Sequence, residues 1–478
     1  MTEDQAYFDS KEFQQILRQY EESVQQGNSI YMDADELADI ADYYQYNGKL
    51  DEADQAINMA LEYNPDAVGP LLYKAREALS AKDFDLARDY AEHIQAVDQE
   101  EAFYLQGEIL ICENKLDEAD ALFEEKIKDI MPDEWTDYVY DVANIFSDYN
   151  AYDKAFMWMA RSRGDDSDDF KELMARTLFG LGKYKDSERI FNELIDHNPY
   201  SIRYWNALAS AQFMNEDYNA AITSSEYAIA IDPHDAESIL SKANSLYSLG
   251  NYESALTFFK RYSEIMPEDE FGFLHQGTCL INLGKFPEAL EVLEQAEHLA
   301  EGAEGDSSYL PDICQELAFT HSEMHHPETA LYYIDKTLDM DCDHINMEVI
   351  RGHILLANHR PEEAEEAFKE ALRLSDNSPK TMLRIIVSLY DNRYVRTSYL
   401  LLKNFFKHVE KDWNEGYSYM ALCCMDMKKT DEFLKYLKMA VDRNPKEART
   451  VLGCYFPEDM PPQDYYEYMS NKLKEESK

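Results

Sequence analysis

The chain of 478 residues has no apolar run of about 18 residues, so we predict no membrane-spanning segment. Its first residues, MTEDQAYFDSKEF, are acidic and lack the apolar core that a secretory signal peptide requires. Glycine and proline are scarce, with 16 and 15 residues, which favours long helices over turn-rich structure. We therefore expect a cytoplasmic, mostly helical protein that does not enter a membrane.

Basic residues are also few. Lys and Arg number 45 against 95 Asp and Glu, which gives a formal net charge of -50. Nucleic-acid backbones and anionic membrane surfaces attract basic proteins, so neither is an expected partner. A basic protein remains compatible with this charge. Apolar residues still make up 45% of the chain, which is enough to build a folded core.

Patterns of catalytic and ligand-binding residues are missing as well. The chain has no glycine-rich phosphate loop, no Ser/His/Asp arrangement and no CxxC pair. The segment HSEMHHPE places His321 and His325 one helical turn apart, but we interpret them as a packed helix position and a turn. The seven cysteines are scattered, and we expect them to be reduced and mostly buried. We therefore expect no enzyme activity, no metal and no cofactor.

A period of 34 residues organises the sequence. Pro199, Pro233 and Pro267 follow one another at this spacing, and a small residue precedes each of them at the same spacing. The small residue recurs in both directions every 32 to 36 residues, except for one gap of 41. Its positions are Ala53, Ala87, Ala119, Ala155, Ser187, Ala221, Ala255, Ala289, Ala330, Ala364, Ser398 and, as a bulky substitute, Phe433. The sequence therefore predicts an array of twelve similar units.

Each unit has the pattern of two helices joined by a tight turn. The first helix carries a small residue, such as Ala209, Gly277 or Gly352, which lets the second helix approach closely. Gly182 and Gly284 stand in the turn, where a helix end requires a left-handed residue. A single helix pair cannot bury its apolar faces, so neighbouring pairs must stack.

The unit from Tyr204 to Pro233 carries the clearest motif. Its motif residues are Trp205, Leu208, Ala209, Tyr218, Ala221, Ala228 and Pro233. In these residues the chain resembles the tetratricopeptide repeat family, and the resemblance extends from about residue 34 to 447. The unit departs from the family by placing Phe213 one residue late, so Phe213 either packs on the next unit or faces the groove. The resemblance implies an all-α fold, a right-handed superhelical α-solenoid of antiparallel helix pairs.

The expected domain organisation follows from the array. Residues 1–33 form an N-terminal capping helix, 34–301 hold repeats 1–8, 302–310 are a loop inserted between repeats, 311–447 hold repeats 9–12, and 448–478 form a C-terminal capping segment. Ser10 is the expected N-cap of the first helix. The insertion accounts for the single long gap, and we expect no domain break there because the period resumes.

Members of this family usually bind peptides or other proteins in a concave groove lined by the first helices. By that resemblance, we expect the groove of the middle units to present Tyr104, Tyr140, Asn144, Arg176, Phe179, Arg203, Asn206, Ser210, Phe213, Asn244 and Tyr247. Asparagine amides can pair with a peptide backbone, and Arg176 and Arg203 can meet a carboxylate. The groove positions include only three acidic residues, Asp42, Glu108 and Glu172, fewer than the overall composition suggests.

The later units present a different groove. Their equivalent positions are mostly apolar and include Leu274, Ile281, Phe319, Leu383, Val387, Tyr390, Leu422 and Met425. Such a stripe suits an amphipathic helix, unless tight winding or the C-terminal segment covers it. The predicted function is a non-catalytic protein–protein interaction scaffold or adaptor that binds a peptide or protein segment in its groove. The alternative is a regulatory subunit that docks a basic protein through an acidic outer surface.

Overall fold

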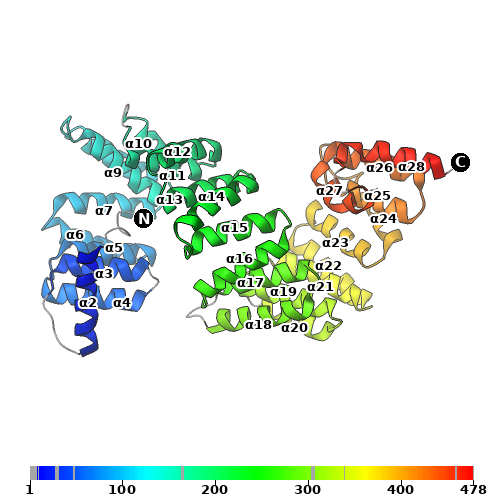
Figure 1. Cartoon of the computed structure of the whole chain (residues 1–478), viewed down its shortest axis with the longest axis horizontal. Helices are drawn as coiled ribbons and strands as arrows, with labels where there is room; N and C mark the ends of the chain where they lie inside the picture. The colour runs from blue at the N-terminus through cyan, green and yellow to red at the C-terminus, as the bar shows by residue number, and fades with distance from the viewer. Residues whose placement is uncertain are drawn as a thin grey trace. The chain divides into compact units, whose positions relative to one another are not determined.

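The computed structural model of the chain describes residues 8, 10–26, 32–46, 49–162, 166–302, 307–338, 340–457 and 460–476. These residues form α-helices, two short 3-10 helices and turns, and contain no strand (Figure 1). Contacts divide the chain into two compact units, Met1–Asn251 and Tyr252–Lys478, which we call unit 1 and unit 2 and describe separately. No described helix is long and apolar enough to cross a bilayer. The all-α fold predicted from the sequence is confirmed.

Unit 1 opens with α2 (Lys11–Gln26), which the Ser10 hydroxyl caps by accepting a hydrogen bond from the Phe13 amide at 3.1 Å, as predicted. The helices that follow in unit 1 are α3 (Ala34–Tyr46), α4 (Leu50–Tyr63), α5 (Val68–Ser80), α6 (Phe84–Gln95), α7 (Gln99–Cys112), α8 (Leu116–Lys126), α9 (Trp135–Asp148), α10 (Tyr152–Met159), α11 (Asp168–Gly180), α12 (Tyr184–His197), α13 (Ile202–Met214), α14 (Tyr218–Ile231) and α15 (Ala236–Ser248).

Unit 2 contains the remaining helices of the array and a closing segment. The array helices are α16 (Tyr252–Ile265), α17 (Glu270–Asn282), α18 (Phe286–Gly302), α19 (Leu310–Glu323), α20 (Pro327–Thr337), α21 (His344–Ala357), α22 (Pro361–Leu374), α23 (Pro379–Asp391), α24 (Val395–Phe405), α25 (Tyr417–Asp426) and α26 (Thr430–Arg443). The closing segment comprises α27 (Pro445–Leu452), η1 (Gly453–Tyr455), η2 (Pro462–Asp464) and α28 (Tyr465–Glu476). The expected insertion at 302–310 falls between α18 and α19, and its residues 303–306 lie outside the described residues.

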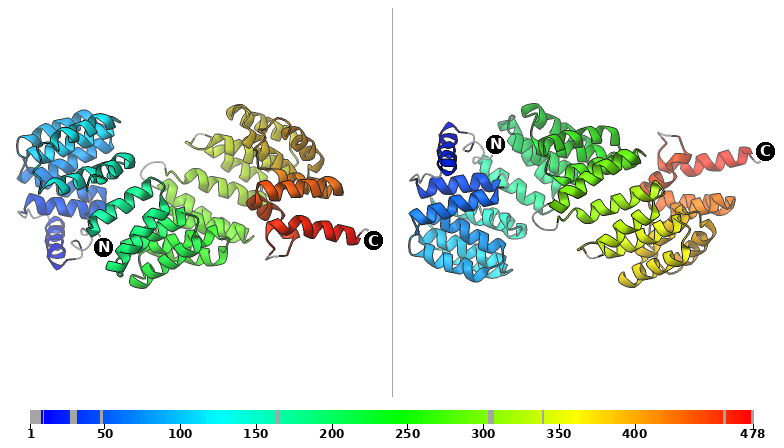
Figure 2. Two further views of the ribbon diagram at one scale, coloured as in Figure 1. Left: turned by 90° about the horizontal axis from the view of Figure 1, so that it is seen from above. Right: turned by 90° about the horizontal axis from the view of Figure 1, so that it is seen from below.

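Helices α3 to α26 succeed one another as twelve pairs, in the order of the twelve predicted repeats. Within each unit, the two helices of a pair contact each other, and most second helices also contact the first helix of the next pair. First helices touch each other along one side, for example α3 with α5 and α21 with α23. Short turns make neighbouring helices antiparallel, and Figure 2 shows them side by side within each unit. The units thus have the predicted solenoid construction.

The small residue of the first helix lies where the second helix packs against it. A Cβ atom added at Gly107 would lie 2.1 Å from the Phe123 ring, and one at Gly277 would lie 2.4 Å from Leu293 Cδ2. Carbon atoms in contact are normally about 3.5–4.0 Å apart. Phe123 and Leu293 are fully buried, so neither can swing out to make room. The absence of a side chain therefore allows the close approach, as predicted.

The turn between the helices of a pair contains a left-handed residue in most repeats. Gly182 and Gly284 have φ angles of 72° and 70°, as the sequence predicts. Glu216 and His325 adopt the same conformation with φ angles of 60° and 62°, although a residue with a side chain is strained there. The Glu216 amide donates to the Phe213 carbonyl at 2.9 Å, which completes the end of the first helix. His325 is thus the turn residue that the sequence indicates.

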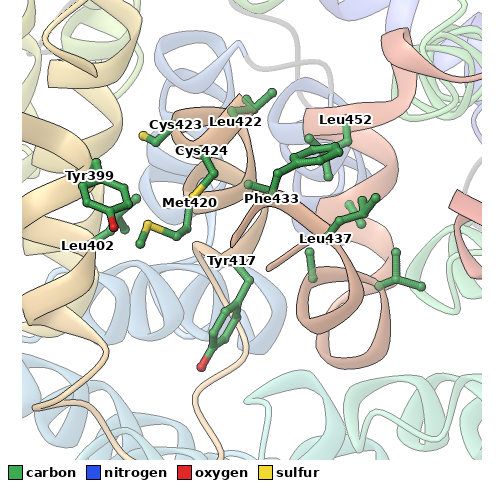
Figure 3. Packing of buried hydrophobic residues seen from close by; sticks show 14 of the residues in the cluster. Tyr399, Leu402, Tyr417, Met420, Leu422, Cys423, Cys424, Phe433, Leu437 and Leu452 are labelled. Atoms are coloured by element: carbon green, nitrogen blue, oxygen red, sulfur yellow. The ribbon is translucent and has the colours of Figure 1, made fainter. Parts of the chain in front are cut away.

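All seven cysteines are unpaired, and their environments differ. Cys279, Cys314, Cys423 and Cys424 are buried, Cys112 and Cys342 are half-buried, and Cys454 is exposed. Figure 3 shows Cys423 and Cys424 in the core cluster of the last repeats, near Met420 and Phe433. Burial raises the pKa of Cys423 to about 12 and that of Cys424 to about 11, so both thiols stay protonated and unreactive at neutral pH.

Candidate binding groove

The predicted groove residues lie on five first helices of unit 1. Tyr104 is on α7, Tyr140 and Asn144 are on α9, Arg176 and Phe179 are on α11, Arg203, Asn206, Ser210 and Phe213 are on α13, and Asn244 and Tyr247 are on α15. All of them are exposed or half-buried except Asn206, which is only 3% exposed. Because α7 contacts α9, α9 contacts α11 and α13 contacts α15, the first helices form one side of the unit. Their role in binding stays a prediction.

Arg176 is part of a polar cluster on this side. Its Nη2 atom lies 2.8 Å from Oδ1 of Asp148, and the Asn144 amide donates to the other carboxylate oxygen at 3.0 Å. Burial raises the pKa of Tyr140, while the charges of Arg176 and Arg203 oppose that shift because they favour the phenolate. The cluster therefore brings two of the predicted residues, Asn144 and Arg176, together around one carboxylate.

A cavity of about 210 Å³ opens beside Arg176. The residues that line it are Ser147, Tyr152, Arg176, Phe179, Phe191, Ala207 and Ser210. Aromatic rings and an alanine supply its apolar surface, and a guanidinium and hydroxyl groups supply its polar surface. Such a cavity has room for an apolar side chain of a bound segment, with Arg176 placed to donate to a carbonyl or carboxylate. Three predicted groove residues thus share one cavity.

Two acidic groove residues of the first helices are already paired. Glu108 accepts hydrogen bonds from the Arg76 guanidinium at 2.9 and 3.2 Å and from the Tyr149 hydroxyl at 2.7 Å. Glu172 forms an ion pair with Arg203. These contacts join α5 to α7 and α11 to α13, and they neutralise both carboxylates. Arg203 is therefore engaged by the chain itself before any partner binds.

Asn206 forms a bridge between two first helices. Its amide nitrogen donates to Asp235 at 3.0 Å and to Glu237 at 3.2 Å, which ties α13 to the start of α15. The Asp235 carboxylate also accepts a hydrogen bond from the Ser238 amide and caps α15. Asn206 was predicted to contact a peptide backbone, but the bridge must break before a bound segment can reach its amide nitrogen.

The two phenylalanines of the predicted groove have equivalent surroundings in successive repeats. Phe213 packs edge-on against Tyr218 with ring centroids 5.3 Å apart, and Phe179 packs in the same way against Tyr184 at 5.4 Å. Each ring therefore contacts the first residue of the second helix of its own repeat. The Phe213 ring is half-buried, so it combines packing within its own repeat with partial exposure.

The remaining predicted residues lie at the two ends of the set. The Tyr104 hydroxyl donates to Asp141 at 3.4 Å, a long hydrogen bond between α7 and α9. Burial and the nearby carboxylate raise the pKa of Tyr104, so its hydroxyl stays protonated and remains a donor. Asn244 and Tyr247 are half-buried on α15, the last first helix of unit 1.

The apolar stripe predicted for the later units lies in unit 2. Its members Leu274, Leu383 and Leu422 are buried, whereas Ile281, Phe319, Val387, Tyr390 and Met425 are half-buried or exposed. Ile281, Phe319, Leu383 and Val387 line a cavity of about 620 Å³ that extends over α17, α19, α21, α23 and α25. Among the described residues, none beyond Glu447 lines this cavity, and α28 packs against α26 instead. The described residues after Glu447 therefore do not cover it.

Another cavity of about 620 Å³ lies at the start of the array, on α3, α4 and α5. Its lining includes the carboxylates of Asp35, Asp39, Asp42, Asp51, Asp54 and Glu77. Lys74 bridges Asp54 and Glu77 at 2.5 and 2.9 Å. Of this set only Asp42 was predicted to face the groove. The spacing of Asp35, Asp39 and Asp42, which places three carboxylates on one face of α3, is the signal that indicates Asp35 and Asp39 as well.

Comparisons with known proteins place the array among repeat proteins. The tetratricopeptide repeat family matches residues 173–236, and the family of anaphase-promoting complex, cyclosome, subunit 3 matches residues 214–296. No curated protein matches the chain significantly.

Several solved structures resemble parts of the chain. A tetratricopeptide repeat protein from Parabacteroides merdae ATCC 43184 is 15% identical, with a TM-score of 0.43, and the match covers 53% of this chain and 98% of that protein. The protein pilF of Pseudomonas aeruginosa is 17% identical, with a TM-score of 0.38, and the match covers 46% of this chain and 96% of pilF. MamA of Desulfovibrio magneticus RS-1 is 16% identical, with a TM-score of 0.34, and the match covers 36% of this chain and 94% of MamA. These likenesses are too partial to carry an argument.

The two family matches fall between α11 and α18, in the middle of the array. The features of the matched repeats also occur outside them, with Gly107 and Gly352 at helix crossings and left-handed residues at Lys82 and His359. The same helix-pair construction therefore continues on both sides of the matched residues. On this evidence residues 173–236 are tetratricopeptide repeats, and the described chain is an array of helix pairs of the same construction.

Proposed function

We propose that the chain is a non-catalytic interaction scaffold that binds an extended protein or peptide segment along the first helices of unit 1. The observation that supports this most strongly is the cavity lined by Arg176, Phe179 and Ser210. It accepts an apolar side chain, and Arg176 beside it donates to a carbonyl or carboxylate of the same segment. Asn206 is left out of this surface because it is buried and its amide nitrogen is engaged.

The charges on this side suit a segment that is not strongly basic. Glu108 and Glu172 are each neutralised by an arginine of a neighbouring first helix. The Asp148 carboxylate is shared between Arg176 and Asn144, and Asp148 is exposed. A carboxylate of the bound segment can therefore replace Asp148 beside Arg176, because the displaced Asp148 charge remains in contact with water. Specificity then comes from the cavity and the donors around it.

Two substitutions in the full chain test this proposal. Ser210→Leu fills the cavity, and Arg176→Gln removes its cation. Both residues are partly or fully exposed, so the helix core is unchanged. As a matched control, Arg189→Gln removes an exposed arginine that pairs with Glu193 on α12. A partner captured by affinity purification is identified by mass spectrometry, and its Kd is measured for each variant.

We expect each groove variant to weaken binding about tenfold or more, because a charge-assisted hydrogen bond or an apolar contact is lost. The control variant should bind like the wild type. Unchanged affinity in both groove variants would show that the partner does not use this side of unit 1.

A second candidate function is a regulatory subunit that docks a basic protein through an acidic surface. The cavity on α3, α4 and α5, with its six carboxylates, favours it. Attraction between exposed charges is screened by salt, so in this case the Kd rises steeply with ionic strength while the groove variants bind normally. Affinity that does not change with salt would exclude this function.

A further inference from the structure

The cavity of unit 2 combines an apolar floor with open access. Phe319 is 38% exposed at its surface, and Ile350 and Val387 are half-buried beside it. Leu383 is buried below them. Five first helices and Glu447 of α27 contribute to this surface, and α28 packs elsewhere, against α26. The described chain therefore leaves an apolar groove without an occupant, which is costly in water unless a partner covers it.

Carboxylates surround this apolar floor. Glu316 and Glu323 of α19 and Glu415 before α25 all line the cavity, and within the described part of the chain none of the three forms an ion pair or a side-chain hydrogen bond. Glu447 differs because it accepts hydrogen bonds from the Gly416 and Ser418 amides at 2.8 and 3.2 Å and caps α25. Three carboxylates are thus available to a partner.

The cavity's own basic groups do not balance these carboxylates. The Arg384 guanidinium donates to the side-chain oxygen of Asn346. His353 lies 3.3 Å from both the Ser388 hydroxyl and the Asn392 amide, and burial lowers its pKa, so it is neutral at physiological pH. The groove therefore carries a net negative charge next to its apolar floor, in contrast to the neutralised carboxylates of unit 1.

Glu316 shows the imbalance most clearly. Burial, and next the charge of Asp312, raise its pKa to about 7. Among the described residues no cation lies close enough to reverse this shift, so the carboxylate is poorly solvated and poorly compensated. A positive charge placed beside Glu316 would supply the missing counter-ion while apolar groups next to it cover Phe319.

We propose that this groove binds an amphipathic protein segment that lays its apolar face on Phe319 and Val387 and places a Lys or Arg beside Glu316 and Glu323. Charge complementarity identifies the occupant, because an apolar segment without cations would bury these carboxylates unpaired. The proposal rests on the scaffold function proposed above, but it concerns a surface of unit 2 and a partner of defined chemistry.

Synthetic peptides test the inference with the full chain. The probe is a fluorescent helical peptide with leucines on one face and lysines on the other. A second peptide has glutamines in place of the lysines, and a third is a scrambled sequence of the same composition as the first. The main variant is Glu316→Gln/Glu323→Gln. The charge-matched control, Glu291→Gln/Glu362→Gln, neutralises two exposed glutamates on the second helices α18 and α22.

Fluorescence anisotropy at physiological salt gives the Kd of each pair. The leucine–lysine peptide should bind about tenfold more tightly than the glutamine and scrambled peptides. The variant Glu316→Gln/Glu323→Gln should lose that advantage, while the control keeps it. Phe319→Ala, a change at an exposed position, should weaken the leucine–lysine and glutamine peptides alike.

Three results would overturn the inference. If the control Glu291→Gln/Glu362→Gln weakens binding of the leucine–lysine peptide as much as Glu316→Gln/Glu323→Gln does, the lysines respond only to the overall charge of the chain. Equal binding of the glutamine peptide would show that the occupant needs no cation. Dimerisation of the chain that Phe319→Ala abolishes, with no peptide binding, would identify a second copy as the occupant. Because Ser210→Leu and Arg176→Gln lie in unit 1, they should not affect peptide binding, so failure of this inference is distinguishable from failure of the proposed function.

Discussion

Gly277 provides a direct test of how the helices of a pair pack. A Cβ atom at this position would lie 2.4 Å from Cδ2 and 2.5 Å from Cγ of Leu293 on α18. Carbon atoms in contact are about 3.5–4.0 Å apart, so Gly277→Ala requires Leu293 to move by about 1 Å. Leu293 is fully buried, and its displacement pushes on the neighbouring core.

The expected effect of Gly277→Ala is the difference between two terms. Overpacking of a core costs about 1–3 kcal/mol. Replacing glycine by alanine in a helix gains about 0.4–1 kcal/mol, because the unfolded chain loses conformational freedom. We therefore expect the free energy of unfolding to fall by about 1–2 kcal/mol. Gly302→Ala at the end of α18 is the control, since its Cβ would meet nothing within 4 Å, and it should stabilise the chain slightly.

A double-mutant cycle then identifies the contact. Leu293→Ala alone should cost about 2–5 kcal/mol through lost burial and a cavity. It should cost about 1–2 kcal/mol less in the Gly277→Ala background, because the clash has gone and the new methyl group fills part of the cavity. Urea unfolding followed by circular dichroism gives the global values, and hydrogen exchange of α17 and α18 gives the local ones, which matter because repeat arrays can unfold in parts. The reasoning is refuted if both glycine variants shift stability in the same direction and the cycle is additive within about 0.5 kcal/mol.

Three further predictions concern turns, a buried ion pair and pH. Gly284→Ala should lower the free energy of unfolding by about 1–2 kcal/mol, because the residue has a φ of 70° that disfavours a side chain. Glu216→Gly should raise it by less than about 1 kcal/mol, because glycine relieves the strain at a φ of 60°. Calorimetry that shows both variants changing stability in the same direction would contradict this. Arg76→Ala should lower the free energy of unfolding in urea by about 2 kcal/mol, because the buried Glu108 carboxylate then keeps only its hydrogen bond from the Tyr149 hydroxyl. An unchanged free energy of unfolding would show that this ion pair does not stabilise the fold. Because the folded-state pKa of Glu316 is about 7, above its ordinary value of 4.5, its ionisation removes stability as pH rises between these values. Glu316→Gln should therefore stabilise the chain by up to about 3 kcal/mol at pH 8 and hardly at pH 4, and a gain that does not depend on pH would argue against a raised pKa.

The fold was largely predictable because each repeat obeys local rules at a fixed period. Ala221, Ala255 and Ala289 mark the same position in successive second helices, so one well-formed motif locates its weaker neighbours. The period also determines turns that residue type alone would miss. Glu216 has little preference for a left-handed conformation, yet it stands where Gly182 and Gly284 stand in other repeats.

The division of the array was not predictable in this way. The boundary of the two compact units lies after Asn251, within the seventh repeat, where the period is unbroken. The one irregular spacing, at 302–310, falls inside unit 2 instead. Compactness depends on contacts between helices, whereas the period records only the succession of helices along the chain. The bounds of the predicted domains therefore remain predictions.

The sequence placed the candidate residues on first helices, but it did not predict which residues they pair with. Arg203 and Asn206 were correctly placed on a first helix, but their partners Glu172 and Asp235 are 31 and 29 residues away. Neighbouring first helices are about one period apart, so a residue that faces the groove has its partners nearly one repeat earlier or later. A search for opposite charges at that offset would have found the Glu172–Arg203 pair and the Glu108–Arg76 pair.

The same limitation explains why the electrostatics of the two grooves were missed. The sequence predicted few acidic residues in the groove, Glu108 and Glu172 among them, but it did not show that arginines neutralise both. In unit 2, by contrast, Glu316 and Glu323 were not among the residues predicted for the groove, although both line the cavity. The first-helix side of unit 1, predicted to be poor in acidic residues, is thus also compensated, and the stripe of unit 2 that was predicted to be apolar is acidic at its edges. Since a compensated carboxylate gains little from an added cation and an uncompensated one gains more, the same chain should prefer a neutral or acidic segment on unit 1 and a basic one on unit 2.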